Sequence, residues 1–344
     1  MDSTFNVESF LSETLDSEDT SLEGFGESGD SNTGELLGGG GIDYRIKQLS
    51  YSGLLNLHSC PRKFQLYRLK TTYKSEDSVK SKVTFAYGHV VGEAIQLAFE
   101  SKTEDEIIWK MFQGWDTDLI YEDEKLEKSF WSAVHAAQKF LSLRDSGFLR
   151  EYELVYYNGL PACELSFCIN FPDGFRLRGF VDGVLRHKGT GEIIVLECKT
   201  TGSATVNPAT YKNSAQAIGY SVVLDHIFPE LSSYKVLYLI YQTKSKEYTP
   251  IQFTKTYLQR ALWIRELLLD IEIIKMYEEA EVYPMRGESC YSFFRECEYM
   301  NTCQLSTEYL TKPATVADLD RTEYQITLTL DDLLDSQLSK METS

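Results

Sequence analysis

Two carboxylates and a lysine near the middle of the chain are the residues best suited to chemistry. Asp182 lies in an apolar run, and Glu197-Cys198-Lys199 follows directly after the apolar stretch 193–196. Because side chains alternate along a strand, Glu197 and Lys199 point to one face and Cys198 to the other. If the two segments pair, Asp182 can join that face. Two carboxylates suit a hard cation such as Mg²⁺, and a neighbouring lysine suits a negatively charged oxygen or a water that is being deprotonated.

The same residues also fit a purely structural interpretation. Asp182 can be a turn residue, and Glu197 with Lys199 can form a surface ion pair where a buried strand ends. Residue types and spacing at this point of the chain favour neither interpretation. The surrounding elements must therefore decide between them.

The pattern of apolar residues predicts one α/β domain with a helical N-terminal part. A turn at Lys188–Gly191 joins the two segments of the candidate site, with glycines suited to positive φ. We expect strands at about 151–157, 163–171, 175–186, 192–198, 234–242 and 249–253. We expect helices at about 50–69, 85–101, 103–114, 124–146, 207–226 and 254–280.

Several details of these helices follow from single residues. Ser52 is expected to cap the first helix, and Pro61 to divide it at Ser59–Pro61. Trp109 and Phe112 are expected to face inward. Asn207-Pro208 is expected to open the helix that follows the candidate site.

The distribution of charge separates the chain into a core and two acidic ends. The net charge is −18, but residues 1–41 carry ten acidic and no basic side chains, and residues 313–344 carry seven acidic and two basic ones. We therefore expect a disordered acidic tail at 1–41, a domain at 42–312 and an acidic tail at 313–344. The tails are candidates for docking a protein partner. No long apolar run or signal peptide is visible, which predicts an intracellular, cytoplasmic protein without a membrane span.

Four motifs in order resemble the PD-(D/E)XK nuclease superfamily, in its RecB-like branch that includes the CRISPR-associated exonucleases. Asp182 with Glu197-Cys198-Lys199 resembles the D…ExK core, and Gln216…Tyr220 resembles the QxxxY motif. Leu54…Cys60-Pro61-Arg62-Lys63-Phe64 is similar to the N-terminal signature of that branch. Cys290, Cys297 and Cys303 resemble the C-terminal cysteines of its iron–sulphur members. The resemblance covers about residues 50–305.

The resemblance implies a central mixed β-sheet flanked by helices, as in restriction endonucleases. It also implies metal-dependent hydrolysis of DNA. Asp182, Glu197 and the backbone carbonyl of Cys198 would hold Mg²⁺ or Mn²⁺, and Lys199 would orient or activate the attacking water. Gln216 and Tyr220 would position DNA. The implied protein is a bacterial or phage DNA exonuclease acting on single strands or duplex ends in recombination, repair or replication. An inactive nucleic-acid-binding or assembly subunit and an endonuclease on the same fold are the alternatives.

One metal ligand of the resembled family is missing from its usual place. A histidine is often found where this chain has Gly92. His89 and Glu93 are the nearby candidates, four residues apart on one helix face. Glu164, on the strand before Asp182, is a further candidate for the site.

The clustered cysteines imply a second centre. By the resemblance, Cys60, Cys290, Cys297 and Cys303 would hold a [4Fe–4S] cluster, with Zn²⁺ as the alternative. The spacing of the last three differs from the usual family pattern, so either metal, or none, fits the sequence. Cys163, Cys168 and Cys198 are expected to be buried thiols.

Basic residues interleaved with aromatic ones are the expected DNA contacts, because aromatic rings stack on single-stranded bases. They are Arg62, Lys63, Arg68, Lys70, Lys74, Lys80, Lys82, Lys244 and Lys246, with Phe64, Tyr67 and Tyr73 between them. Any one of them also fits a solvated basic face.

Overall fold

Eight strands form the central sheet of the part of the chain that the structure describes. The computed structural model describes residues 42–70, 79–116, 127–292, 295–312 and 323–342, all within one compact unit, Ile42–Ser344. Along the sheet the order is β12-β5-β6-β7-β8-β9, and β1 and β2 also pair with β6. Pairing of β7 with β8 and of β5 with β12 is parallel, whereas the β5–β6, β6–β7 and β8–β9 pairs are antiparallel. The predicted mixed α/β sheet is confirmed.

The strands and helices have these bounds. The sheet contains β1 (Gln48–Leu49), β2 (Tyr152–Leu154), β5 (Cys163–Asn170), β6 (Arg176–His187), β7 (Ile193–Thr201), β8 (Ser233–Gln242), β9 (Glu247–Thr256) and β12 (Ile326–Thr329). Two small hairpins are formed by β3 (Tyr156–Tyr157) with β4 (Leu160–Pro161), and by β10 (Tyr291–Ser292) with β11 (Arg295–Glu296). The helices are α2 (Tyr44–Lys47), α3 (Tyr51–Ser59), α4 (Pro61–Arg68), α5 (Val79–Phe99), α6 (Glu104–Gly114), α8 (Phe130–Asp145), α9 (Ala209–Lys212), α10 (Ala215–Leu224), α11 (Tyr257–Glu279), α12 (Thr307–Leu310) and α13 (Leu330–Glu342).

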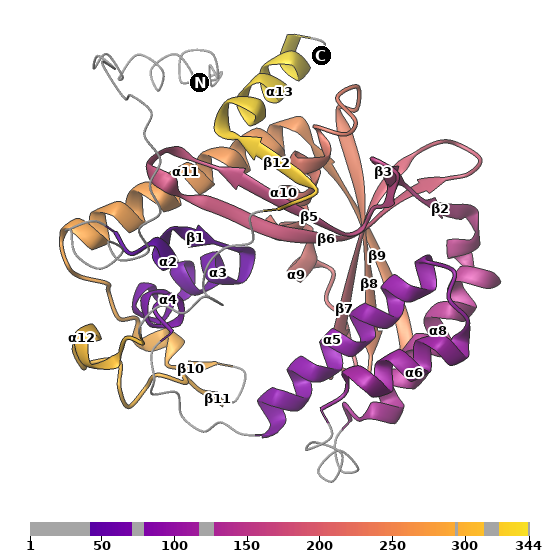
Figure 1. The fold of residues 1–344 in the computed structure, drawn as a ribbon, viewed down its shortest axis with the longest axis horizontal. Coiled ribbons are helices and arrows are strands. Elements are labelled where there is room, and N and C mark those ends of the chain that lie inside the picture. Colours follow the sequence, from indigo (N-terminus) through magenta and orange to yellow (C-terminus); the bar gives the residue numbers. More distant parts are fainter. Residues whose placement is uncertain (1–41, 71–78, 117–126, 293–294, 313–322, 343–344) are drawn as a thin grey trace, which may run out of the picture. The chain divides into compact units, whose positions relative to one another are not determined.

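Helices cover both faces of the sheet, so the central strands are buried on two sides (Figure 1). Along β8, Val236, Tyr238 and Ile240 pack in the core beneath α10 and α11. The alternate residues Leu237, Leu239 and Tyr241 pack in the core beneath α5 and α8. This double burial explains why the central strands have nearly continuous apolar sequences.

Local signals set the ends of several helices. Pro61 starts α4 and Cys60 lies between α3 and α4, so the predicted break is confirmed. The cap of α3 is Ser50, whose Oγ accepts a hydrogen bond from the Gly53 N–H, and not Ser52. The single helix expected at 207–226 is divided, because Ser214 has an extended backbone and separates α9 from α10.

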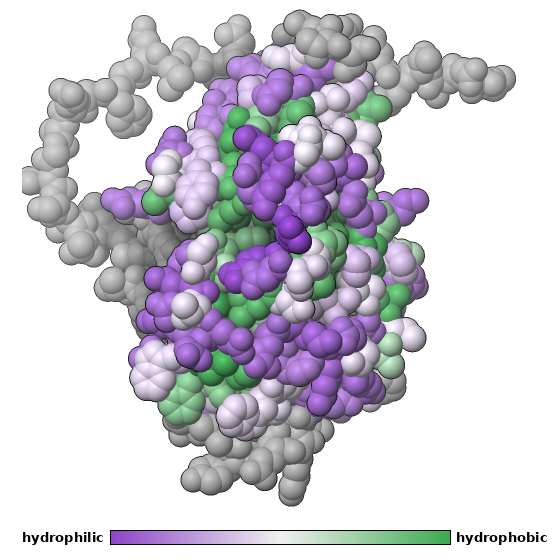
Figure 2. Space-filling model, turned by 90° about the vertical axis from the view of Figure 1, so that its right-hand side faces the viewer, coloured by the Kyte–Doolittle hydropathy of each residue, from purple (hydrophilic) through white to green (hydrophobic). Residues whose placement is uncertain are grey.

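The expectation that Trp109 and Phe112 face inward was wrong. Their exposed fractions are 60% and 48%, whereas Ile107 and Met111 of the same helix are buried. Ile107 and Met111 are four residues apart and form the inner face of α6, which turns Trp109 outward. The side of the molecule that lies on the right in Figure 1 is mostly hydrophilic, with apolar surface showing between the polar groups (Figure 2).

The C-terminal region is not a tail in the part that the structure describes. Strand β12 pairs with β5 from Ile326↔Phe167 to Thr329↔Asn170, and α13 contacts α11. Residues 323–342 therefore belong to the domain, and the boundary expected at residue 312 was wrong. The apolar positions Ile326, Leu328 and Leu333 are buried in the core, which the acidic composition of this region does not reveal. The acidic tail predicted at 1–41 lies outside the described residues.

A buried ionic cluster holds α13 in place. Asp225 Oδ2 accepts hydrogen bonds from Arg260 Nε at 2.9 Å and Gln337 Nε2 at 2.8 Å. Lys340 Nζ lies 3.3 Å from Asp225 Oδ1 and donates to the carbonyl oxygens of Pro229 and Leu231. Burial raises the pKa of Asp225, although the Arg260 guanidinium acts in the opposite direction.

Replacing Asp225 with alanine should destabilise the domain strongly. The change leaves the Arg260 guanidinium, which is fully buried, without its carboxylate. Breaking a buried pair in this way costs about 3–5 kcal/mol. Urea unfolding would measure the loss, with Asp335→Ala, an exposed acid on α13, as the control. A loss equal to that of the control would contradict the proposed role of the cluster.

Candidate active site

The candidate site lies where strands β6 and β7 stop pairing. Their ladder runs from Arg186↔Ile193 to Gly183↔Leu196, and Asp182 and Glu197 are the next residue on each strand. Beyond this point β7 continues its pairing with β8. The Asp182 side chain replaces a backbone hydrogen bond of the ladder, because its Oδ2 accepts a hydrogen bond from the Cys198 N–H at 2.8 Å.

Glu197 is a buried carboxylate with little to neutralise it. Its exposed fraction is 0%, and its Oε1 is in ion-pair contact with Lys199 Nζ. Among the described residues, neither oxygen of Glu197 accepts a hydrogen bond of good geometry. Burial, together with the nearby charge of Asp182, raises the pKa of Glu197 to about 8.

Lys199 connects the acids to helix α10. Its Nζ donates to Gln216 Oε1 at 3.0 Å, and Gln216 Nε2 donates to the Tyr220 hydroxyl at 2.6 Å. Burial lowers the pKa of Lys199, but the Glu197 and Asp182 carboxylates together outweigh burial and the net pKa is raised, so the ammonium stays charged. Gln216 and Tyr220 lie one turn apart on α10, and this spacing holds the chain Glu197–Lys199–Gln216–Tyr220 together.

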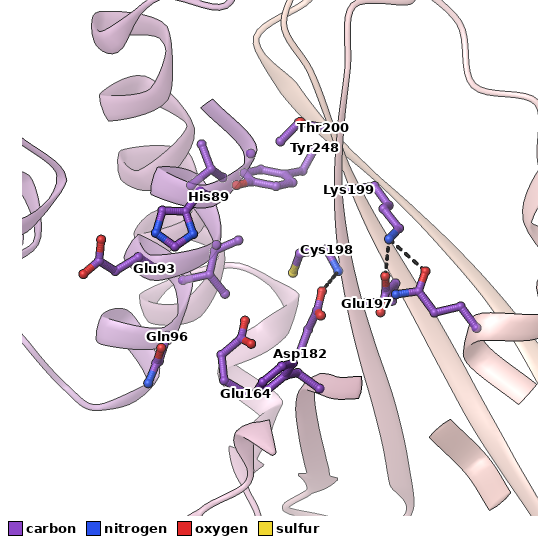
Figure 3. A pocket seen from close by; sticks show the side chains of 16 residues that line it. His89, Glu93, Gln96, Glu164, Asp182, Glu197, Cys198, Lys199, Thr200 and Tyr248 are labelled. Carbon is purple, nitrogen blue, oxygen red and sulfur yellow. Dashed lines mark hydrogen bonds and ion pairs between the residues drawn. The ribbon is translucent and has the colours of Figure 1, made fainter. Parts of the chain in front are cut away.

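Figure 3 shows Glu197 and Lys199 on one side of their strand and the Cys198 sulphur on the other, as the alternation of strand side chains predicts. Cys163 and Cys168 are buried as expected, whereas Cys198 is only half-buried. Its side chain faces the cavity wall formed by α5.

Glu164 is a third acid in the site. Strand β5 pairs with β6 at Cys163↔Gly183 and at Leu165↔Val181, so Glu164 lies opposite Asp182 between the two pairs. Its φ is +48°, a conformation that is strained for a residue with a side chain and is found at functional sites. Its carboxylate points toward that of Asp182 (Figure 3). Burial, and then the Asp182 charge, raise the pKa of Glu164 to about 7.

A cavity of about 500 Å³ gives access to these groups. Helix α5 forms one wall with His89, Gly92, Glu93 and Gln96, and Thr200 and Tyr248 line it from the sheet. Gln96, Thr200 and Tyr248 were not anticipated, since they carry no motif and reach the site only through the packing of α5 and β9.

The described residues offer no clear substitute for the histidine ligand that the resembled family often has at the position of Gly92. His89 and Glu93 both line the cavity, but Glu93 points away from the acids and its Oε2 lies 3.1 Å from where a Cβ on Gly114 would be (Figure 3). A Cβ on Gly92 would meet no described atom within 4 Å, so the space for a side chain there is open. Among the described residues, no three His, Cys, Asp or Glu side chains form a group that could hold a metal ion.

The four cysteines predicted to form a second centre do approach one another. The Cys297 N–H donates to the Cys290 carbonyl oxygen at 2.7 Å, and Ser289 Oγ donates to the Ser59 carbonyl oxygen at 2.6 Å. Arg62 Nε, two residues after Cys60, donates to the Cys303 carbonyl oxygen at 2.8 Å. Burial is the main cause of the raised pKa of Cys297 and of Cys303. The four residues, in the conformation described, are not arranged as a metal-ligand set.

Several of the basic and aromatic residues predicted to contact DNA have structural roles. Arg62 donates to the carbonyl oxygens of Cys303 and Leu305, and Arg68 donates to that of Arg45. Phe64 is fully buried and cannot stack on a base. Lys244 lies 3.7 Å from Glu127, and Lys246 is exposed. Lys74 and Tyr73, and the side chains of Lys80 and Lys82, lie outside the described residues.

In the described part of the chain no helix is both long enough and apolar enough to span a membrane.

Comparison with known proteins identifies the class to which the fold and this site belong. The family model described as "PD-(D/E)XK nuclease superfamily" matches residues 48–304, about three-quarters of the chain. The chain belongs to the PD-(D/E)XK nuclease superfamily, and it is therefore a nuclease by family, for which DNA is the implied substrate.

The individual relatives are distant. No curated protein matches the chain. A crystal structure from Eubacterium rectale, of a protein assigned only provisionally as an exonuclease, has 13% identity and a TM-score of 0.46, and the match covers 86% of this chain and 100% of that one. The structure of SSO0001 has 16% identity and a TM-score of 0.25, with 65% and 88% covered. Similarity at this level does not inform the activity of this chain.

The raised pKa values predict how stability should depend on pH and on Mg²⁺. The folded pKa of Glu197, about 8, lies above the ordinary value of 4.5, so the folded state holds an extra proton between these values. Stability of the metal-free protein should therefore fall as pH rises from 5 to 8. Mg²⁺ should raise Tm more at pH 8 than at pH 6, because at pH 6 it must displace protons.

Thermal unfolding of wild type, Glu197→Gln and the surface control Glu247→Gln at both pH values would check this. The Tm of Glu197→Gln should fall less steeply with pH than that of wild type, and Mg²⁺ should raise it much less. The control should behave as wild type. Equal Mg²⁺ shifts in all three proteins would contradict the prediction.

Proposed function

We propose that this protein is a metal-dependent DNA exonuclease that hydrolyses phosphodiester bonds of single strands or duplex ends. The observation that carries the proposal is the fully buried Glu197 carboxylate, which lies beside a second acid, Asp182, and is in ion-pair contact with Lys199. The resemblance of the sequence motifs to RecB-like nucleases supports a role in recombination, repair or replication.

The donor atoms are of the kind that Mg²⁺ and Mn²⁺ prefer, although the three carboxylates are not arranged as a ligand set in the conformation described. Asp182, Glu197 and the Cys198 carbonyl supply oxygen atoms, which these ions prefer, and Glu164 supplies another carboxylate at the same cavity. Two buried acids with raised pKa values mark a place where positive charge is missing. When bound there, a divalent cation lowers the pKa of water and stabilises the charge that develops on a phosphate.

Lys199 supplies the remaining positive charge. Its ammonium is held between Glu197 and Gln216, and its side chain is 38% exposed, so it reaches the cavity. From that position Nζ can donate to a non-bridging phosphate oxygen or to the attacking water. Gln216 and Tyr220 orient the lysine, and in this role they are positioning residues.

The size of the cavity favours one strand over two. A space of about 500 Å³ is typical of pockets that enclose a small ligand, and it has no room for a duplex. The acids lie at its inner end, with Glu197 fully buried. A cavity of this size admits a phosphate of a single strand more readily than one of a duplex, which favours free ends and frayed duplex termini.

Incubation with end-labelled single-stranded DNA, with Mg²⁺ or Mn²⁺ and with EDTA, tests the proposal. Glu197→Ala and Lys199→Ala should each lower the rate of hydrolysis at least a hundredfold, since each removes charge from the site of bond breaking. Lys235→Ala is the matched control, because Lys235 is also paired to a glutamate and is 36% exposed. Undiminished hydrolysis in both site variants would refute the assignment of the active site to Glu197 and Lys199. No hydrolysis by the wild type would refute an active nuclease and favour an inactive DNA-binding subunit.

Closed circular single-stranded DNA separates the exonuclease from an endonuclease. An enzyme that needs an end should leave the circle intact and should degrade the same DNA after one cut. Cleavage of both forms at similar rates would make the protein an endonuclease on the same fold.

We further propose that the four cysteines hold a [4Fe–4S] cluster with a structural role. The support is their convergence from distant parts of the chain, since Cys60 follows α3 and the others lie beyond α11, and hydrogen bonds to backbone carbonyl oxygens hold the two regions together. Anaerobic purification should give protein with iron, sulphide and broad visible absorbance, all lost in Cys297→Ser, while Cys163→Ser keeps them. Zinc alone would identify the alternative metal, and absence of both metals would refute the centre.

A further inference from the structure

A second cavity lies against the candidate active site and has a different character. Its volume is about 540 Å³, and it is enclosed by α3, β6, α10 and α11. Four residues line both cavities: Phe180, Asp182, Lys199 and Gln216. The two spaces are therefore adjacent at the Lys199 ammonium.

Aromatic rings form the inner wall of the second cavity. Phe167, Tyr220 and Trp263 all line it, and the rings of Phe167 and Tyr220 meet edge to face with centroids 6.2 Å apart. A Cβ on Gly219 would lie 2.8 Å from Trp263 Cζ2, so the indole packs directly on the backbone of α10. This close packing fixes the indole in place in the wall.

The rim of the second cavity is open and carries charged groups of both signs, including Arg178. Leu55 is 49% exposed, and His58 Nε2 contacts both oxygens of Asp270 at 2.8 Å. Glu266 lies on the same rim and is exposed. The Asp270 carboxylate is buried and paired with His58, and the Lys199 ammonium at the other end of the cavity favours a phosphate.

We propose that the second cavity receives a base of the DNA strand, next to the phosphate that lies at Lys199. A nucleotide joins a charged phosphate to a flat base, and the structure joins a cationic site to a pocket with an aromatic wall. This inference rests on the proposed nuclease function and adds a base-binding subsite to it. Recognition by stacking is tolerant of sequence, because every base has a π face.

Binding in EDTA tests the subsite without cleavage. The full-length protein would be titrated with a fluorescently labelled ten-residue thymidine oligonucleotide and with a ten-residue abasic backbone of equal charge. Trp263→Leu should weaken binding of the thymidine oligonucleotide about fivefold or more, the range expected for one base–aromatic contact. Binding of the abasic backbone should change less than twofold.

Leu55→Ala is the second variant, because a half-exposed rim residue can be changed without disturbing the fold. It should also weaken binding of the thymidine oligonucleotide more than binding of the abasic backbone, but by a smaller factor than Trp263→Leu. Leu258→Ala is the matched control, since Leu258 is a 56% exposed leucine on α11 that does not line the cavity.

Equal losses for both oligonucleotides in folded variants, or no loss in either, would overturn the inference. If Trp263→Leu does not fold, the selectivity of Leu55→Ala decides the question. Wild-type hydrolysis of DNA with no difference between the variants would refute the base subsite and leave the nuclease intact. Base-dependent binding without hydrolysis would refute the nuclease and leave the subsite.

Discussion

The divergence of β6 and β7 is the constraint on which the site depends. Both strands are held by other neighbours, so they can separate at Asp182 and Glu197 without loss of the sheet. The Asp182 carboxylate accepts the Cys198 N–H, which keeps that donor satisfied at the point of separation. The separation of the strands creates the space of the site. Because Glu197 is buried beside Asp182, a positive charge in that space would stabilise the ionised form of both carboxylates.

The layers around the sheet give this space two different walls. Helix α5 and the sheet bound the polar cavity, while α3, α10 and α11 bound the cavity with the aromatic wall. Lys199 lies at their junction because strand alternation directs it toward α10, where Gln216 fixes its ammonium. One lysine thus connects acids, helix and both cavities, and this explains why the charged and apolar parts of the site are adjacent.

Contacts between distant parts of the chain close the domain around the site. Helix α4 is held to the cysteine region by the hydrogen bonds from Arg62 to Cys303 and Leu305. At the opposite end of the chain, β12 extends the sheet and α13 is anchored by Asp225, Arg260 and Lys340. Neither connection contributes a group to the candidate active site, and both restrain the helices that line it.

The sequence by itself indicated the family. It also singled out the candidates for the active site, which are Asp182, Glu197, Lys199, Gln216 and Tyr220. Alternation in strands and one-turn spacing in helices are local rules, so they predict which of these side chains share a face. It also indicated the sheet and the break at Pro61, which depend on nearby residues alone. Two predictions were wrong, namely that Trp109 faces inward and that the acidic C-terminal region is a tail throughout. Both depend on burial, and burial is decided by what packs against a segment.

Only the tertiary structure decided which other groups join the site and which leave it. Glu164 is a candidate from the sequence, but its place beside Asp182 depends on an interruption of the β5–β6 ladder that no sequence pattern marks. Arg62 and Arg68 bind carbonyl oxygens of distant residues, a structural role that their charge alone does not reveal. The cavity with the aromatic wall combines residues from 50 to 270, and such a space exists only where separate elements pack. Composition and spacing act along the chain, whereas charge neutralisation, burial and cavities depend on groups brought together by the fold.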